Sequence, residues 1–227
     1  MTPSPLRIRL LAAGLLSGLA ACASGPPVPD WQMNAQSSAE RFEAAYLGGN
    51  DLVESVEFKR ARAQLASTGQ VELVTRVELL RCATRVASLV FEACPGFEKL
   101  RQDAAAPERA YADYLAGHAT AAATALLPPQ QRAVAGAASD TAAAAAAAAI
   151  TDPLSRLVAA GALLRAHRAT PALLADAVAT ASAQGWSRPL LAWLGAQAMR
   201  AEQADDAAEG RRIRRRMALV LGSDPAP

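Results

Sequence analysis

This sequence has few aromatic residues, histidines and lysines. Phe, Trp and Tyr together supply ten of the 227 residues, and histidine and lysine supply two each. No segment alternates polar and apolar residues as a β-strand would. Alanine is abundant, with 58 copies, and it loses no side-chain entropy in a helix. The composition therefore predicts an all-α fold whose helices pack closely over Ala, Leu and Val.

Sequence motifs typical of enzymes and metal sites are also missing. There is no G-x-S-x-G nucleophile elbow, no S-x-x-K, no H-E-x-x-H and no glycine-rich phosphate loop. His118 and His167 each lack a second ligand type at metal-binding spacing. We therefore predict no catalytic residue, no cofactor and no metal site. A pair of acids assembled from distant segments stays open as an alternative.

Neither sign of charge dominates. Lys and Arg total 23 against 21 Asp and Glu, so a nucleic acid is not expected as a partner. Some glutamates have the spacing to pair with arginines across a helical turn. These are Glu57 with Arg60 and Arg62, and Glu78 with Arg81 and Arg85.

The spacing of apolar residues predicts a series of helices. The first ends at Gly48-Gly49, and others span about 51–67, 70–86, 95–104 and Pro107 to near Gly117. Leu52, Val56 and Phe58 are expected on the inner face of the second helix. The eight alanines Ala142–Ala149 offer little surface to bury, so a helical spacer or a partly frayed helix is expected there.

In the C-terminal part, a capping side chain precedes a proline three times. The three sites are Asp152-Pro153, Thr170-Pro171 and Ser187-Arg188-Pro189, and Asp205-Asp206 begins a last helix. Short loops make consecutive helices antiparallel, so we predict stacked antiparallel helical hairpins. Leu191, Leu194 and Ile213 are expected to face inward across the last hairpin, and Trp193 to pack at a hairpin junction.

The N-terminal segment has the arrangement of an export signal. Arg7 and Arg9 precede an apolar run, Leu10 to Leu19, that is too short to span a bilayer. The run ends at Leu19-Ala20-Ala21-Cys22, which resembles the lipobox of bacterial lipoproteins. The resemblance implies export, cleavage before Cys22 and lipidation of that cysteine. An ordinary signal peptide with a chance cysteine is the alternative.

The lipobox resemblance also implies a location and a division of the chain. Ala23, rather than Asp, follows the cysteine, which resembles the sorting pattern for release to the periplasmic face of the outer membrane. Residues 1–21 are then the signal peptide, and 22–30 the lipidated cysteine with a Pro/Gly-rich tether. An all-α domain follows over 31–222, with a candidate sub-boundary near 120–150. Residues 223–227 form a short tail.

Cys82 and Cys94 are expected to form a disulfide, because paired cysteines in an exported protein are usually bridged. Twelve residues span roughly 18 Å along a helix, whereas bridged Cα atoms lie about 5.5 Å apart. The helix must therefore end between the two cysteines, and Cys94-Pro95-Gly96 supplies a break. Two buried free thiols are the alternative.

Two stretches resemble parts of the tetratricopeptide repeat. One stretch resembles the first helix and turn of this repeat through Leu191, Leu194, Gly195, Ala198, Asp205-Asp206 and Ala207. The other stretch resembles the turn and second helix of the repeat through Tyr46, Gly49-Asn50, Phe58 and Ala61. Neither stretch completes the 34-residue pattern. The resemblance implies an α-solenoid-like interaction scaffold and transfers no binding residue.

A run of arginines marks the last predicted helix: Arg211, Arg212, Arg214, Arg215 and Arg216. One interpretation is contact with anionic lipid headgroups, lipopolysaccharide phosphates or an acidic partner. The other is a solvated helix face whose cations suit the helix dipole, with Ile213, Met217 and Val220 turned to the core.

Together these features predict a non-catalytic scaffold, anchored by its N-terminal lipid, that binds another envelope protein. A cell-wall-active enzyme or accessory factor with dispersed carboxylates is one alternative. A protein that contacts lipid or lipopolysaccharide is the other.

The lipid anchor is tested by Cys22→Ala. Each buried methylene contributes about 0.8 kcal/mol, so two or three acyl chains hold a protein stably on a membrane. We expect the wild-type protein to sediment with membranes and to carry lipid by mass spectrometry, and the variant to be soluble. A membrane-bound variant beside an unlipidated wild type would contradict the prediction.

Overall fold

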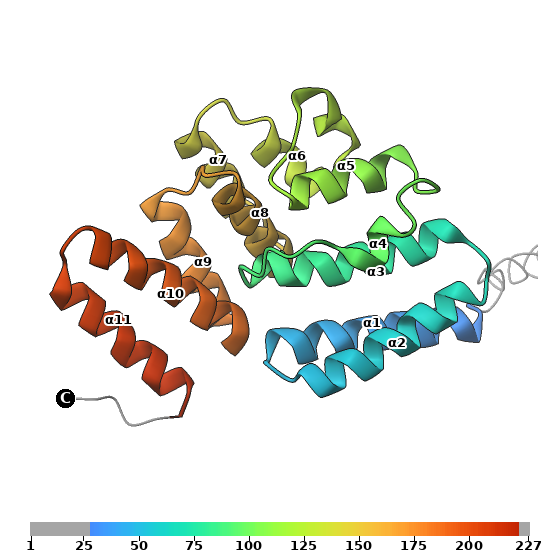
Figure 1. Ribbon diagram of the computed structural model, residues 1–227, viewed down its shortest axis with the longest axis horizontal. Coiled ribbons are helices and arrows are strands. Elements are labelled where there is room, and N and C mark those ends of the chain that lie inside the picture. The colour runs from blue at the N-terminus through green and yellow to red at the C-terminus, as the bar shows by residue number, and fades with distance from the viewer. Residues whose placement is uncertain (1–27, 223–227) are drawn as a thin grey trace, which may run out of the picture.

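The computed structural model describes residues 28–222, and these form an all-α fold without any β-strand (Figure 1). Cys22, the signal segment and the tail 223–227 lie outside the described residues. The helices are α1 (Asp30–Leu47), α2 (Asp51–Ala66), α3 (Val71–Ala87), α4 (Pro95–Glu98), α5 (Ala106–Leu115), the 3₁₀ helix η1 (Ala121–Leu126), α6 (Pro129–Ala135), α7 (Asp140–Ala148), α8 (Pro153–Arg165), α9 (Pro171–Ala183), α10 (Ser187–Gln203) and α11 (Ala207–Val220). Antiparallel hairpins, α1–α2 and α10–α11, stand at the two ends of this stack.

The first hairpin packs on α3 around two phenylalanines. Phe42 and Phe58 meet edge to face, with ring centroids 5.5 Å apart. The prediction for α2 was wrong at Leu52 and Val56, whose exposed fractions are 77% and 41%. The buried face of α2 instead carries Glu54, Phe58 and Ala61. The carboxylate of Glu54 is therefore buried, whereas the apolar side chains that the spacing placed inside are exposed.

The helix α3 ends where the predicted disulfide requires. The chain leaves the helix after Ala87, turns at Leu89 with a left-handed φ of 59°, and returns to Cys94. Cys82 and Cys94 are bridged, with their Cα atoms 5.9 Å apart. The helix predicted over 95–104 is shorter than expected, because only Pro95–Glu98 is α-helical and turns follow.

The alanine run is part of the core, so the prediction of a spacer or frayed helix was wrong. It forms most of α7, capped by the Ser139 side chain. Ala143, Ala144 and Ala147 are buried in the main apolar cluster, which continues on both sides of the segment 120–150. A helix face of methyl groups lets neighbouring helices approach closely, and this contact offsets the small area each alanine buries.

Two of the three predicted proline-linked caps are present. The side chains of Asp152 and Thr170 accept hydrogen bonds from backbone N–H groups of α8 and α9, and that of Asp206 caps α11. Ser187 does not cap α10, because it is already the first residue of that helix. Its hydroxyl donates instead to the carbonyl oxygen of Gly48, 3.0 Å away.

The C-terminal half of the stack is joined to α3 by two contacts at consecutive residues. On α8, Gly161 lies so close to Val86 that an added Cβ would collide with the Val86 carbonyl oxygen. On α10, the fully buried Trp193 donates from its indole Nε1 to the Ala87 carbonyl oxygen, 3.0 Å away. As predicted, Trp193 is a packing residue, and it lies where α10 meets the end of α3.

The last hairpin provides a matched pair of variants. Leu194 of α10 and Ile213 of α11 are fully buried, so Leu194→Ala should lower the free energy of unfolding by about 2–5 kcal/mol. Arg214 is exposed, and within residues 28–222 its one ion pair is with exposed Glu202. Arg214→Ala should therefore change stability by less than about 0.5 kcal/mol. Chemical denaturation measures both, and a neutral Leu194→Ala would contradict the packing of this hairpin.

Candidate functional site

Four glutamates are buried around α3, each with an exposed fraction below 10%: Glu54, Glu57, Glu78 and Glu108. Each pairs with at least one arginine from another element. Arg81 bonds Glu54 at 2.6 Å, Arg41 bonds Glu57 at 2.9 Å, Arg62 bonds Glu78 at 2.7 Å and Arg76 bonds Glu108 at 3.1 Å. Buried carboxylates with such partners are expected to hold helices together.

These pairs correct the within-helix pairing predicted from the sequence. Only Glu57–Arg60, at 2.6 Å, is present as predicted. Arg62 bonds Glu78 of the next helix instead of Glu57, and Arg81 and Arg85 bond Glu54 instead of Glu78. The carboxylates of Glu54 and Glu78 are paired across the interface between α2 and α3, so their guanidinium partners belong to the neighbouring helix.

Hydrogen bonds and nearby charges affect the pKa of the Glu57 carboxyl group more than burial does. Burial raises the pKa of this carboxyl, but hydrogen bonds from Arg41 and Ser38 and the charges of Arg41 and Arg60 bring the pKa below its usual value. Glu57 therefore stays ionised near neutral pH and serves as an anchor for arginines rather than as a general acid.

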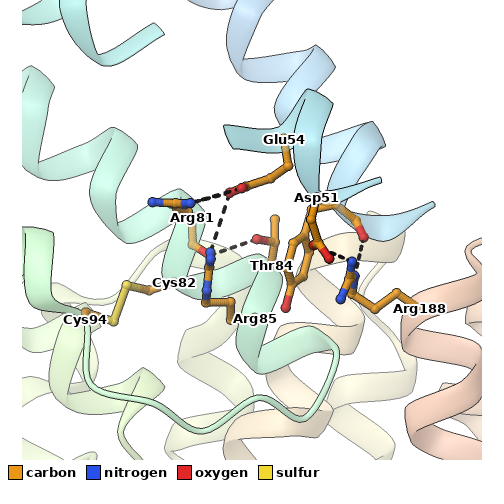
Figure 2. Close-up of polar contacts among 9 residues, drawn as sticks. Asp51, Glu54, Arg81, Cys82, Thr84, Arg85, Cys94 and Arg188 are labelled. Atoms are coloured by element: carbon orange, nitrogen blue, oxygen red, sulfur yellow. Dashed lines mark hydrogen bonds and ion pairs between the residues drawn. A yellow bond between two sulfur atoms is a disulfide. The ribbon is translucent and has the colours of Figure 1, made fainter. Parts of the chain in front are cut away.

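The charged network continues from α3 to the C-terminal hairpins (Figure 2). Arg81 holds both carboxylate oxygens of Glu54, and Arg85 reaches the same carboxylate at 3.6 Å. Arg188 of α10 bonds Asp51 at 2.5 Å and the Tyr46 carbonyl oxygen at 2.7 Å. Its guanidinium also lies 4.5 Å from the centre of the Tyr46 ring. These contacts fix α10 against the turn between α1 and α2.

A groove of about 520 Å³ lies on the other side of α3, between α3, α5, η1 and α6. Leu79 and Leu80 of α3, Tyr111 of α5 and Leu127 form apolar parts of its lining. Leu126 also lines the groove and is 42% exposed. The volume is within the usual range of small-ligand pockets, about 300–1,000 Å³.

The polar groups of the groove come from α3, α5 and α6. Arg76 bonds Glu108 and also pairs with Glu72. The second carboxylate oxygen of Glu108, Oε2, is buried and has no hydrogen-bond partner. Arg132 donates from Nε to the Leu127 carbonyl oxygen at 2.8 Å. Burial raises the pKa of Tyr111, so this phenol is neutral at physiological pH.

The arginine run of α11 is separate from this groove. In Figure 1, α11 lies at the left end of the molecule, and α9 and α10 lie between it and α3, α5 and α6. Ile213 is buried, as predicted, and Arg212 and Arg214 pair with Glu209 and Glu202. The remaining arginines, Arg211, Arg215 and Arg216, have no ion pair within residues 28–222.

Other predicted residues are not brought into one site. His118 and His167 are both exposed, after the ends of α5 and α8. No group of three or more His, Cys, Asp or Glu residues that could hold a metal ion occurs in the part of the chain that the structure describes. Over the same residues, no helix is long and apolar enough to cross a membrane.

Sequence analysis did not identify the groove. Its lining residues come from separate helices, and no motif joins them. One signal was present, since Glu108 shares an apolar helix face with Ala112 and Leu115 at steps of four and three. A carboxylate on such a face calls for a buried partner or a ligand.

No known protein family, curated protein or solved structure matches this chain.

The Glu54 network is tested by Arg81→Leu. The substitution leaves buried Glu54 with only the longer contact to Arg85, so we expect a loss of about 2–4 kcal/mol in the free energy of unfolding. Arg200→Ala on the exposed part of α10 is the control and should stay within about 0.5 kcal/mol. Equal unfolding midpoints in urea would rule out a stabilising role for the network.

Proposed function

We propose that this protein is a lipid-anchored scaffold of the bacterial envelope that presents the groove between α3, α5 and α6 to an apolar segment of another envelope protein. The lipobox resemblance of Leu19-Ala20-Ala21-Cys22 supports the anchor and the outer-membrane location. The Cys82–Cys94 disulfide is consistent with an oxidising compartment such as the periplasm.

The groove carries the proposal. It is concave and mainly apolar, and Leu126 in its lining is partly exposed, features that mark binding surfaces. Its walls are held in place before any partner arrives. Arg76 links α3 to α5, the buried Tyr114 hydroxyl donates to Gln131 of α6 at 2.8 Å, and the Cys82–Cys94 bridge constrains the return from α3. Such preorganisation reduces the entropy lost on binding.

The enzyme alternative has less support. A general acid and base need carboxylates that converge on a cavity. The buried glutamates around α3 are bonded to arginines, and the groove is lined by one carboxylate, Glu108.

Contact with anionic lipid is the second candidate, favoured by one observation on α11. Arg211, Arg215 and Leu219 are spaced four residues apart along the helix, and all three are exposed. A helix face that combines cations with an exposed leucine is suited to a membrane surface. This face is distinct from the groove, so both surfaces can operate in one protein.

The docking function is tested by Leu126→Gln, with Leu52→Gln as its control. Both leucines are exposed, but only Leu126 lines the groove. After crosslinking in intact cells and purification, we expect Leu126→Gln to reduce recovery of the main crosslinked protein roughly tenfold, as for a residue that contacts the partner directly. Leu52→Gln should recover as much as wild type. Equal recovery with both variants would overturn the docking function.

A further inference from the structure

The unpaired polar side chains of the groove are hydrogen-bond donors. Arg132 of α6 is exposed, and its Nε donates to the Leu127 carbonyl oxygen. The two terminal nitrogens of its guanidinium make no hydrogen bond or ion pair within residues 28–222. The Tyr111 hydroxyl also has no partner over the same residues, and burial raises its pKa, so it keeps its proton. An occupant that brings acceptor atoms would satisfy both groups.

The charge of the lining favours an anionic acceptor. The charged lining residues are Arg76, Arg132 and Glu108, so two cations and one anion give a sum of +1. Arg76 already bonds the carboxylates of Glu72 and Glu108. The free oxygen of Glu108 is buried and out of reach of an occupant. Arg132 is therefore the charge that remains for a ligand, and a guanidinium can bind a carboxylate through two N–H groups.

The main chain of the lining suits a helix better than a strand. Three lining residues, Pro107, Pro128 and Pro129, are prolines and carry no N–H group. An extended segment would find few main-chain donors along this wall. A helix closes its own main-chain hydrogen bonds and needs only an apolar surface for its apolar face.

We infer that the groove takes an amphipathic helix that carries one aspartate or glutamate beside its apolar face, with the carboxylate bonded to Arg132. The inference rests on the proposed docking function and names the chemistry of the partner. The apolar face would pack against Leu79 and Leu127 and cover the partly exposed Leu126. Because the Leu127 carbonyl already holds the Arg132 side chain, little of its freedom is lost on binding.

The test uses a phage-displayed library of random peptides of about 15 residues, a length at which isolated helices begin to form. The library is selected in parallel on purified wild type, Leu126→Gln, Arg132→Gln and the control Arg109→Gln. Arg109 matches Arg132, since it is an exposed arginine that donates to a main-chain carbonyl oxygen, but it does not line the groove.

The inference predicts a different result for each variant. We expect wild type and Arg109→Gln to enrich peptides with apolar residues at helical spacing and one acidic residue. Arg132→Gln should enrich the same apolar pattern without the acidic residue. On Leu126→Gln, enrichment of both features should fall roughly tenfold.

A second measurement leaves the protein unchanged, so it holds even if an Arg132 variant unfolds. The best peptide is compared by calorimetry with its copy in which the matching amide, Asn or Gln, replaces the acidic residue. We expect affinity to fall about fivefold or more, as when a charge-assisted hydrogen bond is lost. Added salt should weaken the acidic peptide and leave the amide copy nearly unchanged.

The outcomes separate the two proposals. Equal affinity of the acidic peptide and its amide copy would overturn the role of Arg132 and leave docking intact. No enrichment on wild type over Leu126→Gln would overturn both. Laurate that binds as tightly as the peptide and displaces it would overturn the helical partner and assign the groove to a single-chain anionic lipid. A wild-type dimer in sedimentation that dissociates in Leu126→Gln would assign it to a second copy of this chain.

Discussion

The close approach of α8 to α3 is the constraint on which the rest of the structure depends. It requires glycine at position 161, because any side chain there would meet the Val86 carbonyl oxygen. The next residue along α3, Ala87, receives the indole N–H of Trp193. One end of α3 therefore positions both α8 and α10. The same helix also carries Cys82 of the disulfide and two leucines of the groove, Leu79 and Leu80.

Arginine side chains stack on several of the ten aromatic residues of this protein. The guanidinium of Arg81 lies 4.1 Å from the centre of the Phe58 ring while it holds Glu54. Arg85 and Arg188 lie over the Tyr46 ring. A planar guanidinium can stack on a ring and bind a carboxylate through two N–H groups, which a lysine ammonium cannot do. Buried glutamates are tolerated beside these helices because each is met by such a group.

Features that depend on residues close together in the sequence were predicted, whereas features that depend on the packing of distant helices were missed. Asp152 and Thr170 cap their helices, because a cap acts within a few residues. The disulfide is present as predicted, but the helix break that permits it lies after Ala87 and not at Cys94-Pro95. The exposure of Leu52 was not predictable from spacing, since helical periodicity does not say which polar residue will find a buried partner. Burial of the alanine run and formation of the groove both depend on how distant helices meet.

The proposed anchor limits where a partner of the groove can lie. If lipid is attached at Cys22, the seven residues 23–29 span at most about 25 Å before α1 begins. The first hairpin is then held near the membrane surface, whereas α11 stands at the opposite end of the stack (Figure 1). Contact of α11 with the same membrane would require the stack to lie along it. The groove belongs to the part of the stack nearer the anchor, so its partner must come within a short reach of the bilayer. That geometry favours a partner that is itself anchored or embedded in the envelope.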